Sequence, residues 1–208
     1  MVDRRVRGRK ADDRARPEFK GTSMAELDGG SRNATATRAQ IQRRIEAARG
    51  YLALEMFDHA LGELDVIRQQ SQYRFERYRL RGEALRGLNR WNDAVVAYMQ
   101  ALAEQPEALP LLLALAECYR RLGRLDRAMM ALEEAYRIGP DEPAILYEMA
   151  RLYLLSGNLP CGLPWLARAV QSCPDLAGLA EGDVDFTTIH DLPWFQQLLD
   201  AAAALKAY

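Results

Sequence analysis

Apolar residues recur along this chain at steps of three and four positions, and the whole pattern returns after 34 residues. Residues 109–142 show one period. A first apolar stripe predicts a helix that ends at Gly123, and a second stripe predicts a helix that ends at Gly139 and Pro140. Glycine favours the left-handed conformation that ends many helices, and proline cannot continue one. Asp126 is expected to cap the start of the second helix. Each period is therefore predicted to be a hairpin of two helices.

The period is visible in columns of equivalent residues. Two columns contain only alanine or glycine, one contains large residues and one contains proline. They are Ala48, Gly82, Ala116 and Ala150; Ala60, Ala94, Ala128 and Gly162; Tyr51, Leu85, Tyr119 and Tyr153; and Pro106, Pro140 and Pro174. Only a small residue fits where two helix axes cross closely, while leucine and tyrosine fill the space beside the crossing. A single hairpin is too small to bury its own apolar face, so consecutive hairpins are expected to stack.

These residues resemble the tetratricopeptide repeat, a helix–turn–helix unit of 34 residues. The best copy contains, in the order of that family's pattern, Leu112, Leu115, Ala116, Tyr119, Ala128, Leu132, Ala135 and Pro140. The resemblance covers four copies, at 41–74, 75–108, 109–142 and 143–176. The first copy is the weakest, because Gln72 stands where the pattern has proline. The resemblance implies an all-α, right-handed solenoid of stacked helix–turn–helix repeats.

The two ends of the chain depart from the repeat. Residues 1–36 are rich in Arg, Asp, Gly and Ser and lack periodicity, so they are expected to form a disordered basic arm. A capping box at Thr37 and Gln40 is expected to begin the ordered repeats, residues 37–176. Residues 177–208 are predicted to form a linker and a C-terminal capping helix over the last hairpin. The alternative is that this helix docks on another subunit. The acidic residues of the predicted linker are Glu181, Asp183 and Asp185.

Composition restricts the classes of function. The formal net charge is −1, which disfavours general affinity for nucleic acid or anionic membrane surfaces. Residues 1–40 carry ten Lys and Arg against six Asp and Glu, so nucleic-acid binding by the basic arm is kept as an alternative. No apolar run approaches the roughly 20 residues of a membrane-spanning helix, and a secretory leader is not expected. Three cysteines, an odd number without metal-ligand spacing, favour a reducing cytoplasm.

Residue patterns typical of catalytic sites are absent from the sequence. It contains no phosphate-binding loop, no dinucleotide-binding glycine pattern and only two histidines, His59 and His190. Cys118 is interpreted as a small core residue rather than a nucleophile. We therefore predict a non-catalytic protein without a cofactor or a bound metal ion.

The resemblance also implies a binding face. In that family, the side of each first helix that the core does not use lines a concave groove for a peptide or a partner helix. The corresponding residues here are Arg49, Arg79, Glu83, Arg86, Leu113, Glu117, Arg120, Arg121, Tyr147 and Arg151. Arginine binds carboxylates through paired hydrogen bonds, and arginine and tyrosine often dominate interface energies. We expect Arg86, Arg120 and Arg121 to bind acidic groups of a partner, and Tyr147 to anchor an apolar side chain.

The predicted function is that of a scaffold or adaptor that binds an extended or helical segment of another protein. A dedicated chaperone for a hydrophobic client is an alternative, suggested by leucines and tyrosines on the same face. Another alternative is an ordinary solvated face, in which Glu83 pairs with Arg86, and Glu148 pairs with Arg151, along their own helices. The identity of the partner and the oligomeric state stay open at this point.

Overall fold

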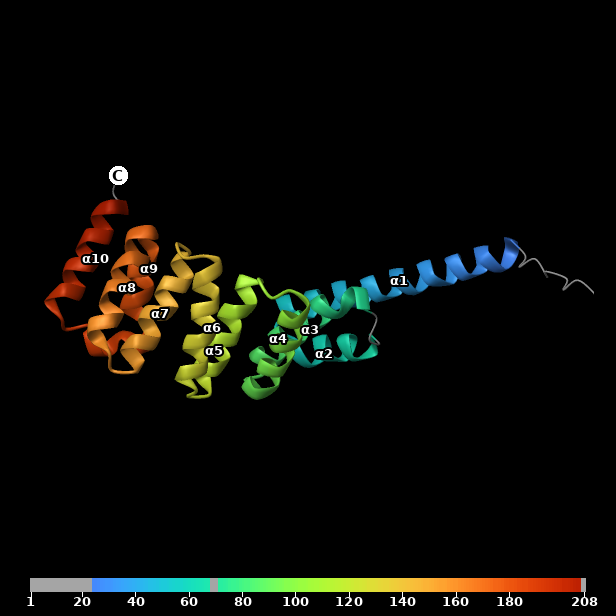
Figure 1. Cartoon of the computed structure of the whole chain (residues 1–208), viewed down its shortest axis with the longest axis horizontal. Coiled ribbons are helices and arrows are strands. Elements are labelled where there is room, and N and C mark those ends of the chain that lie inside the picture. The colour runs from blue at the N-terminus through green and yellow to red at the C-terminus, as the bar shows by residue number, and fades with distance from the viewer. Residues whose placement is uncertain (1–23, 68–70, 207–208) are drawn as a thin grey trace, which may run out of the picture. The chain divides into compact units, whose positions relative to one another are not determined.

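The described part of the chain, residues 24–67 and 71–206 of a computed structural model, consists of helices joined by short turns (Figure 1). The helix pairs are α1 (Met24–Ala53) with α2 (Phe57–Val66), α3 (Arg74–Gly87) with α4 (Trp91–Glu104), α5 (Leu109–Arg121) with α6 (Leu125–Ile138), and α7 (Pro143–Leu155) with α8 (Leu159–Ser172). The remaining elements are η1 (Ser71–Tyr73), a short 3-10 helix before α3, and α9 (Asp175–Gly182), η2 (Val184–Ile189) and α10 (Pro193–Lys206) after α8. No strand occurs among these residues, which confirms the predicted all-α class.

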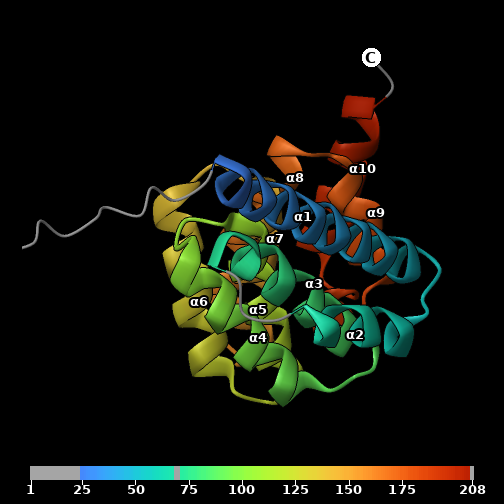
Figure 2. The same ribbon diagram turned by 90° about the vertical axis from the view of Figure 1, so that its right-hand side faces the viewer.

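By its internal contacts the chain divides into residues 1–40 and residues 41–208. In the second unit each helix pair packs on the next: α2 contacts α3, α4 contacts α5, and α6 contacts α7. Figure 2 looks along this stack, in which the pairs lie one behind another. The stacking of helix–turn–helix units confirms the predicted solenoid.

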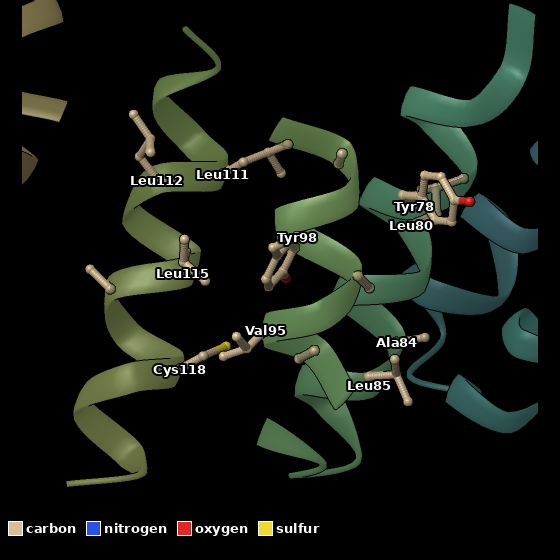
Figure 3. Packing of buried hydrophobic residues seen from close by; sticks show 14 of the residues in the cluster. Tyr78, Leu80, Ala84, Leu85, Val95, Tyr98, Leu111, Leu112, Leu115 and Cys118 are labelled. Carbon is tan, nitrogen blue, oxygen red and sulfur yellow. The ribbon is translucent and has the colours of Figure 1, made fainter. Parts of the chain in front are cut away.

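The small columns lie in the core of the stack, as predicted. Ala48 has no exposed surface and Ala116 is 2% exposed. Gly82 of α3 lies directly against the Tyr98 ring of α4, so that a Cβ atom added at Gly82 would lie 2.4 Å from Tyr98 Cε1. Figure 3 shows the side chain of Leu111 extending from α5 toward α4, where Tyr98 lies. Close helix crossings therefore explain why these positions hold only alanine or glycine.

The adjacent residues Ala116 and Glu117 provide a test of this packing. Ala116→Leu should lower the free energy of unfolding by about 1–3 kcal/mol, because added methylenes overpack a close crossing. Glu117→Ala should change it by only about 0.5 kcal/mol, because Glu117 is partly exposed beside a groove. Urea denaturation of both variants measures the difference. Equal effects would show that the two side chains do not face core and groove, respectively.

The turn inside each helix pair has one repeated backbone conformation. The residues with positive φ, between 56° and 76°, are Glu55, Asn89, Gly123 and Gly157, each 34 positions from the next. The N–H group one residue further on donates to a carbonyl five positions earlier, as from Met56 to Tyr51 at 2.8 Å. This is the Schellman arrangement, which satisfies carbonyl groups at a helix end. Gly123 therefore ends α5 as predicted.

Glu55 holds a left-handed conformation that favours glycine. Glu55→Gly should raise the free energy of unfolding by about 0.5–1 kcal/mol, because a residue with a Cβ atom is strained at positive φ. Gly123→Ala should lower it by a similar amount for the same reason. Thermal denaturation of the two variants provides the measurement. Changes of the same sign would contradict a shared turn conformation.

Three expectations about element boundaries are wrong. The first helix begins at Met24, so Thr37 lies inside α1 and does not cap its start. The start of α6 is preceded by Arg124, and Asp126 lies in the first turn of the helix instead of capping it. The segment expected as a linker forms α9 and η2. Of the expected basic arm, residues 1–23 lie outside the described part of the chain.

Candidate functional site: a groove across the first helices

An open groove crosses α3, α5 and α7, the first helices of three successive pairs. Its volume is about 510 Å³. Leu111, Leu113 and Ala114 of α5 form an apolar floor, and Tyr98 of α4 lies beneath it. The charged residues around the floor are Arg79, Glu83, Arg86, Glu117, Glu148 and Arg151. The groove thus combines apolar surface for a side chain with polar groups at its edges, which is the usual composition of a binding site.

A second, smaller pocket of about 360 Å³ adjoins the groove on the side of α1 and α2. Leu52, Phe57 and Trp91 contribute its apolar surface. Arg86 and Glu117 line both pockets, and their side chains form an ion pair of 2.7 Å between α3 and α5. This ion pair therefore separates two apolar pockets on one face of the array.

Ion pairs also connect the first helices at the N-terminal side of the groove. Glu76 accepts hydrogen bonds from Arg49 of α1 and from Arg79 of its own helix, both at 2.6 Å. Arg79 also pairs with Glu83. The hydrogen bond from Arg79, with a further one from Arg49, lowers the pKa of Glu76 in spite of its partial burial. Each of these arginines is therefore neutralised by a carboxylate of the chain itself.

At the C-terminal side, the segment after α9 lies against the same face. Asp185 of η2 forms an ion pair of 2.7 Å with Arg120 of α5 and lies 3.7 Å from Arg151 of α7. Asp183 pairs with Arg151 and accepts a hydrogen bond of 3.2 Å from the Tyr147 hydroxyl. The expected acidic linker is thus a docked part of the fold.

Tyr147 lies beneath this docked segment. Its ring centroid is 5.1 Å from that of Phe186, which has no exposed surface. The guanidinium of Arg151 lies over the Tyr147 ring at 5.0 Å. Tyr147 itself is only 2% exposed, so the expectation that it offers a free aromatic anchor to a partner is wrong for this conformation.

The structure divides the ten residues of the predicted binding face into three groups. The residues that line the open groove are Arg79, Glu83, Arg86, Leu113, Glu117 and Arg151. Arg120 and Tyr147 contact the docked C-terminal segment, as Arg151 also does. Arg49 pairs with Glu46 and Glu76 beside the groove, and Arg121 lies over the Trp91 ring at 5.8 Å. Arg121 is therefore directed to α4 and does not line the groove.

Sequence reasoning missed the contribution of Asp183, Asp185 and Phe186. The predicted repeats end at residue 176, and the acidic residues beyond were interpreted as part of a linker. One indication was available, because Phe186 and Ile189 lie three residues apart in a segment that was expected to be exposed. Both are fully buried. The predicted pair of Glu148 with Arg151 is present at 2.7 Å, whereas Glu83 pairs with Arg79 and Arg86 pairs with Glu117.

Two carboxyl groups beside Arg151 have pKa values shifted in opposite directions. Burial raises the pKa of Glu148, and the nearby arginines do not fully compensate. Burial alone would also raise the pKa of Asp183, but a hydrogen bond from the Asp185 backbone N–H and the charge of Arg151 lower it below its ordinary value. Asp183 is therefore the stabilising carboxylate, and the charge of Glu148 is a cost to folding.

These shifts predict opposite pH effects. At neutral pH, Asp183→Asn should lower the free energy of unfolding by about 1–3 kcal/mol, because a charged hydrogen bond is lost. Glu148→Gln should leave it unchanged or raise it by up to about 0.5 kcal/mol. The contribution of Asp183 is present above its unfolded pKa and is lost as pH falls through its lower folded pKa. The cost of Glu148 is relieved as pH falls through its raised folded pKa toward the unfolded value.

Urea denaturation of both variants and the parent chain between pH 3 and pH 7 measures these effects. Toward acidic pH, the stability deficit of Asp183→Asn relative to the parent should shrink, and any stability gain of Glu148→Gln should shrink as well. A destabilised Glu148→Gln variant at neutral pH would show that its pairing with Arg151 outweighs the cost of burial.

Three features of the described residues bear on function: the reactivity of the Cys118 thiol, metal binding and membrane insertion. Burial raises the pKa of the Cys118 thiol to about 11, so it is protonated at neutral pH, and it packs in the core near Val95 (Figure 3). Within the described ranges, no three His, Cys, Asp or Glu side chains are arranged to hold a metal ion. None of the described helices has the length and apolar character required to span a membrane.

Comparisons with known proteins agree with the geometry of the array. Sequence models of the tetratricopeptide repeat family match residues 79–143 and residues 121–175. Residues 79–175 are tetratricopeptide repeats. The matches extend from α3 to the end of α8, which includes the helices around the groove. Tetratricopeptide repeats are protein-interaction modules, and the array is accordingly a scaffold for protein binding. No curated protein matches the chain.

Solved structures of tetratricopeptide repeat proteins show the same fold. MamA aligns with a TM-score of 0.60 at 18% identity, over 71% of this chain and 86% of MamA. A thermophilic protein from Thermus thermophilus aligns with a TM-score of 0.56 at 20% identity, over 81% of this chain and 100% of its own. A tetratricopeptide repeat protein from Parabacteroides merdae aligns with a TM-score of 0.58 at 15% identity, over 81% of this chain and 62% of its own. At these identities the likeness shows the fold alone.

Proposed function

We propose that this array is a non-catalytic adaptor of the cytoplasm, whose open groove binds an extended or helical segment of another protein through an apolar side chain. The observation that supports the proposal is the groove of about 510 Å³, with an apolar floor at Leu111, Leu113 and Ala114. A pocket of this size accommodates a bulky side chain. The three cysteines are unpaired, which is consistent with a reducing compartment.

The charges at the groove favour a partner with a particular pattern. Arg79 already pairs with two carboxylates of the chain, and Arg151 pairs with Glu148 and the docked segment. Among the residues that the structure describes, Arg86 pairs with Glu117 alone, and 42% of its side chain is exposed. A partner carboxylate therefore has its best access at Arg86. We propose a segment that places an apolar side chain on Leu113 and an acidic group near Arg86.

Site-specific photocrosslinking tests the groove directly. A photoreactive phenylalanine derivative is introduced in place of Leu113 in the groove, or in place of Met130, which is 68% exposed on α6. Position 113 should crosslink a specific protein in cells, and position 130 should not. Equal crosslinking of the same protein from both positions would place the contact elsewhere.

Charge reversal at the groove gives a quantitative test with the partner that crosslinking identifies. Arg86→Glu should weaken binding of the crosslinked partner by roughly tenfold or more and slow its association, because the complementary charge is reversed. Arg137→Glu is the matched control. Arg137 lies on α6, is 72% exposed and, like Arg86, pairs with a glutamate, which in this case belongs to its own helix. Similar losses in both variants would assign the effect to net charge instead of the groove.

A further inference from the structure

The C-terminal segment Asp183–Phe186, here called the acidic segment, contacts the binding face in the manner of a ligand. Its two carboxylates pair with Arg120 and Arg151, and its aromatic side chain packs on Tyr147. Charged hydrogen bonds to arginine combined with a buried aromatic side chain are the contacts that dominate many protein interfaces. The receiving side chains come from α5 and α7, so they belong to the repeats and not to the segment itself.

The fit of the acidic segment is incomplete. The Nε atoms of Arg120 and Arg151 are buried, yet neither has a hydrogen-bond partner among the described residues. Val184, between the two acidic residues, is 78% exposed. Asp183 caps η2 and the other three residues of the segment belong to it; η2 is a 3-10 helix, which has poorer hydrogen-bond geometry than an α-helix. Arg151 Nε lies 3.7 Å from an Asp185 carboxylate oxygen, within ion-pair distance but without a hydrogen bond, so the segment satisfies the two guanidinium groups only in part.

We propose that Arg120, Tyr147 and Arg151 form a recognition site for a partner protein segment with the order acidic, any residue, acidic, aromatic, and that the acidic segment occupies this site in the isolated chain. A partner segment of the same pattern binds by displacing it. The inference extends the proposed function to the neighbouring part of the same face, and it does not require that the open groove bind a partner.

Competition within one chain has a defined consequence for affinity. A tethered segment has a high effective concentration, on the order of millimolar for short flexible connections. An external segment therefore binds with an apparent affinity reduced by the fraction of molecules in which the site is open. Weakening the acidic segment, while its receiving residues stay intact, should increase that fraction and strengthen external binding.

The test uses the full chain and a fluorescent peptide with the sequence of residues 181–190. Phe186→Ala removes the aromatic side chain of the acidic segment without altering Arg120, Tyr147 or Arg151. This variant should bind the peptide at least about tenfold more tightly than the parent chain in fluorescence anisotropy. The peptide should also raise the thermal midpoint of the variant. A control peptide with both aspartates changed to asparagine and phenylalanine changed to alanine should not bind.

Further variants keep the test decisive if Phe186→Ala disrupts the C-terminal helices. Asp183→Asn combined with Asp185→Asn retains the aromatic side chain, weakens only the ion pairs, and should also increase peptide affinity. Adding Arg120→Gln to either variant should remove the gain. The proposal is overturned if folded variants bind the peptide no better than the parent chain, or if binding survives Arg120→Gln. Variants that form dimers which the peptide does not dissociate would identify a second copy as the occupant and also overturn it.

Because the probe is a defined peptide, this result is independent of the crosslinked partner. Peptide binding without crosslinking at position 113 would support the recognition site and reject the groove. Crosslinking at position 113 without peptide binding would support the groove and reject the recognition site.

Discussion

Tyr98→Ala should lower the free energy of unfolding by about 3–5 kcal/mol, the cost of removing a large aromatic side chain from a core. Tyr98 has no exposed surface and lies where α3, α4 and α5 meet, so few neighbours are free to close the cavity. Its loss should affect two helix pairs at once. Urea denaturation followed by circular dichroism provides the measurement.

Tyr98→Phe separates the ring from its hydroxyl group. The Tyr98 hydroxyl is buried and has no hydrogen-bond partner among the described residues, and burial raises its pKa. Burying an unpaired hydroxyl costs about 1–3 kcal/mol, so Tyr98→Phe should leave stability unchanged or raise it by about 1 kcal/mol. A clear loss would show that the hydroxyl has a partner, such as an ordered water molecule, and that the aromatic ring is not the whole contribution.

Gly82→Ala should lower the free energy of unfolding by about 1–3 kcal/mol, although alanine is the better helix former by about 1 kcal/mol. The added Cβ atom would lie 2.4 Å from Tyr98 Cε1 and 2.9 Å from Tyr98 Cζ, so the ring or the helix must move. Gly62→Ala in α2 is the matched control. Apart from the adjacent residues and the nearby backbone of α2 itself, no heavy atom lies within 4 Å of the Cβ position there, and this variant should gain about 0.5–1 kcal/mol.

The combination of Gly82→Ala with Tyr98→Leu tests the direct contact. If the Cβ atom and the ring collide, the combined loss should be smaller than the sum of the two single losses, by more than about 0.5 kcal/mol. Additive losses would place the cost of Gly82→Ala elsewhere in α3.

The core of the repeats could be predicted from sequence because every helix pair has the same close crossing, which excludes side chains larger than alanine at equivalent positions. Ala48 and Ala116 are buried at equivalent crossings, and Gly123 ends α5 in the left-handed conformation. The same turn position holds Glu55 in the first repeat. That residue type carries no indication of positive φ, and only its place in the period identifies it.

The start of the first helix was not predictable from local pattern. Thr37 and Gln40 have the spacing of a capping box, but the same residues are compatible with a helix interior. Upstream residues continue the helix to Met24. A local capping pattern competes with continuation of the helix, and sequence spacing alone does not decide between them.

The candidate site was predicted in part. Leu113 and Glu117 line the groove because their positions on α5 are fixed by the core residues around them. The partners of the arginines were less predictable, since glutamates three and four residues away compete with those on the next helix. Arg86 thus pairs with Glu117, which is 31 positions away, and not with Glu83.

The sequence by itself determined the repeat, its buried small columns and the face that the first helices direct away from the core, because each follows from helical spacing within 34 residues. Only the tertiary structure decided how much of that face is available. Asp185 reaches Arg120 across 65 positions, and Phe186 covers Tyr147, because the chain folds back after the last repeat. No periodic pattern specifies such a contact, since it depends on the path of the chain beyond the period.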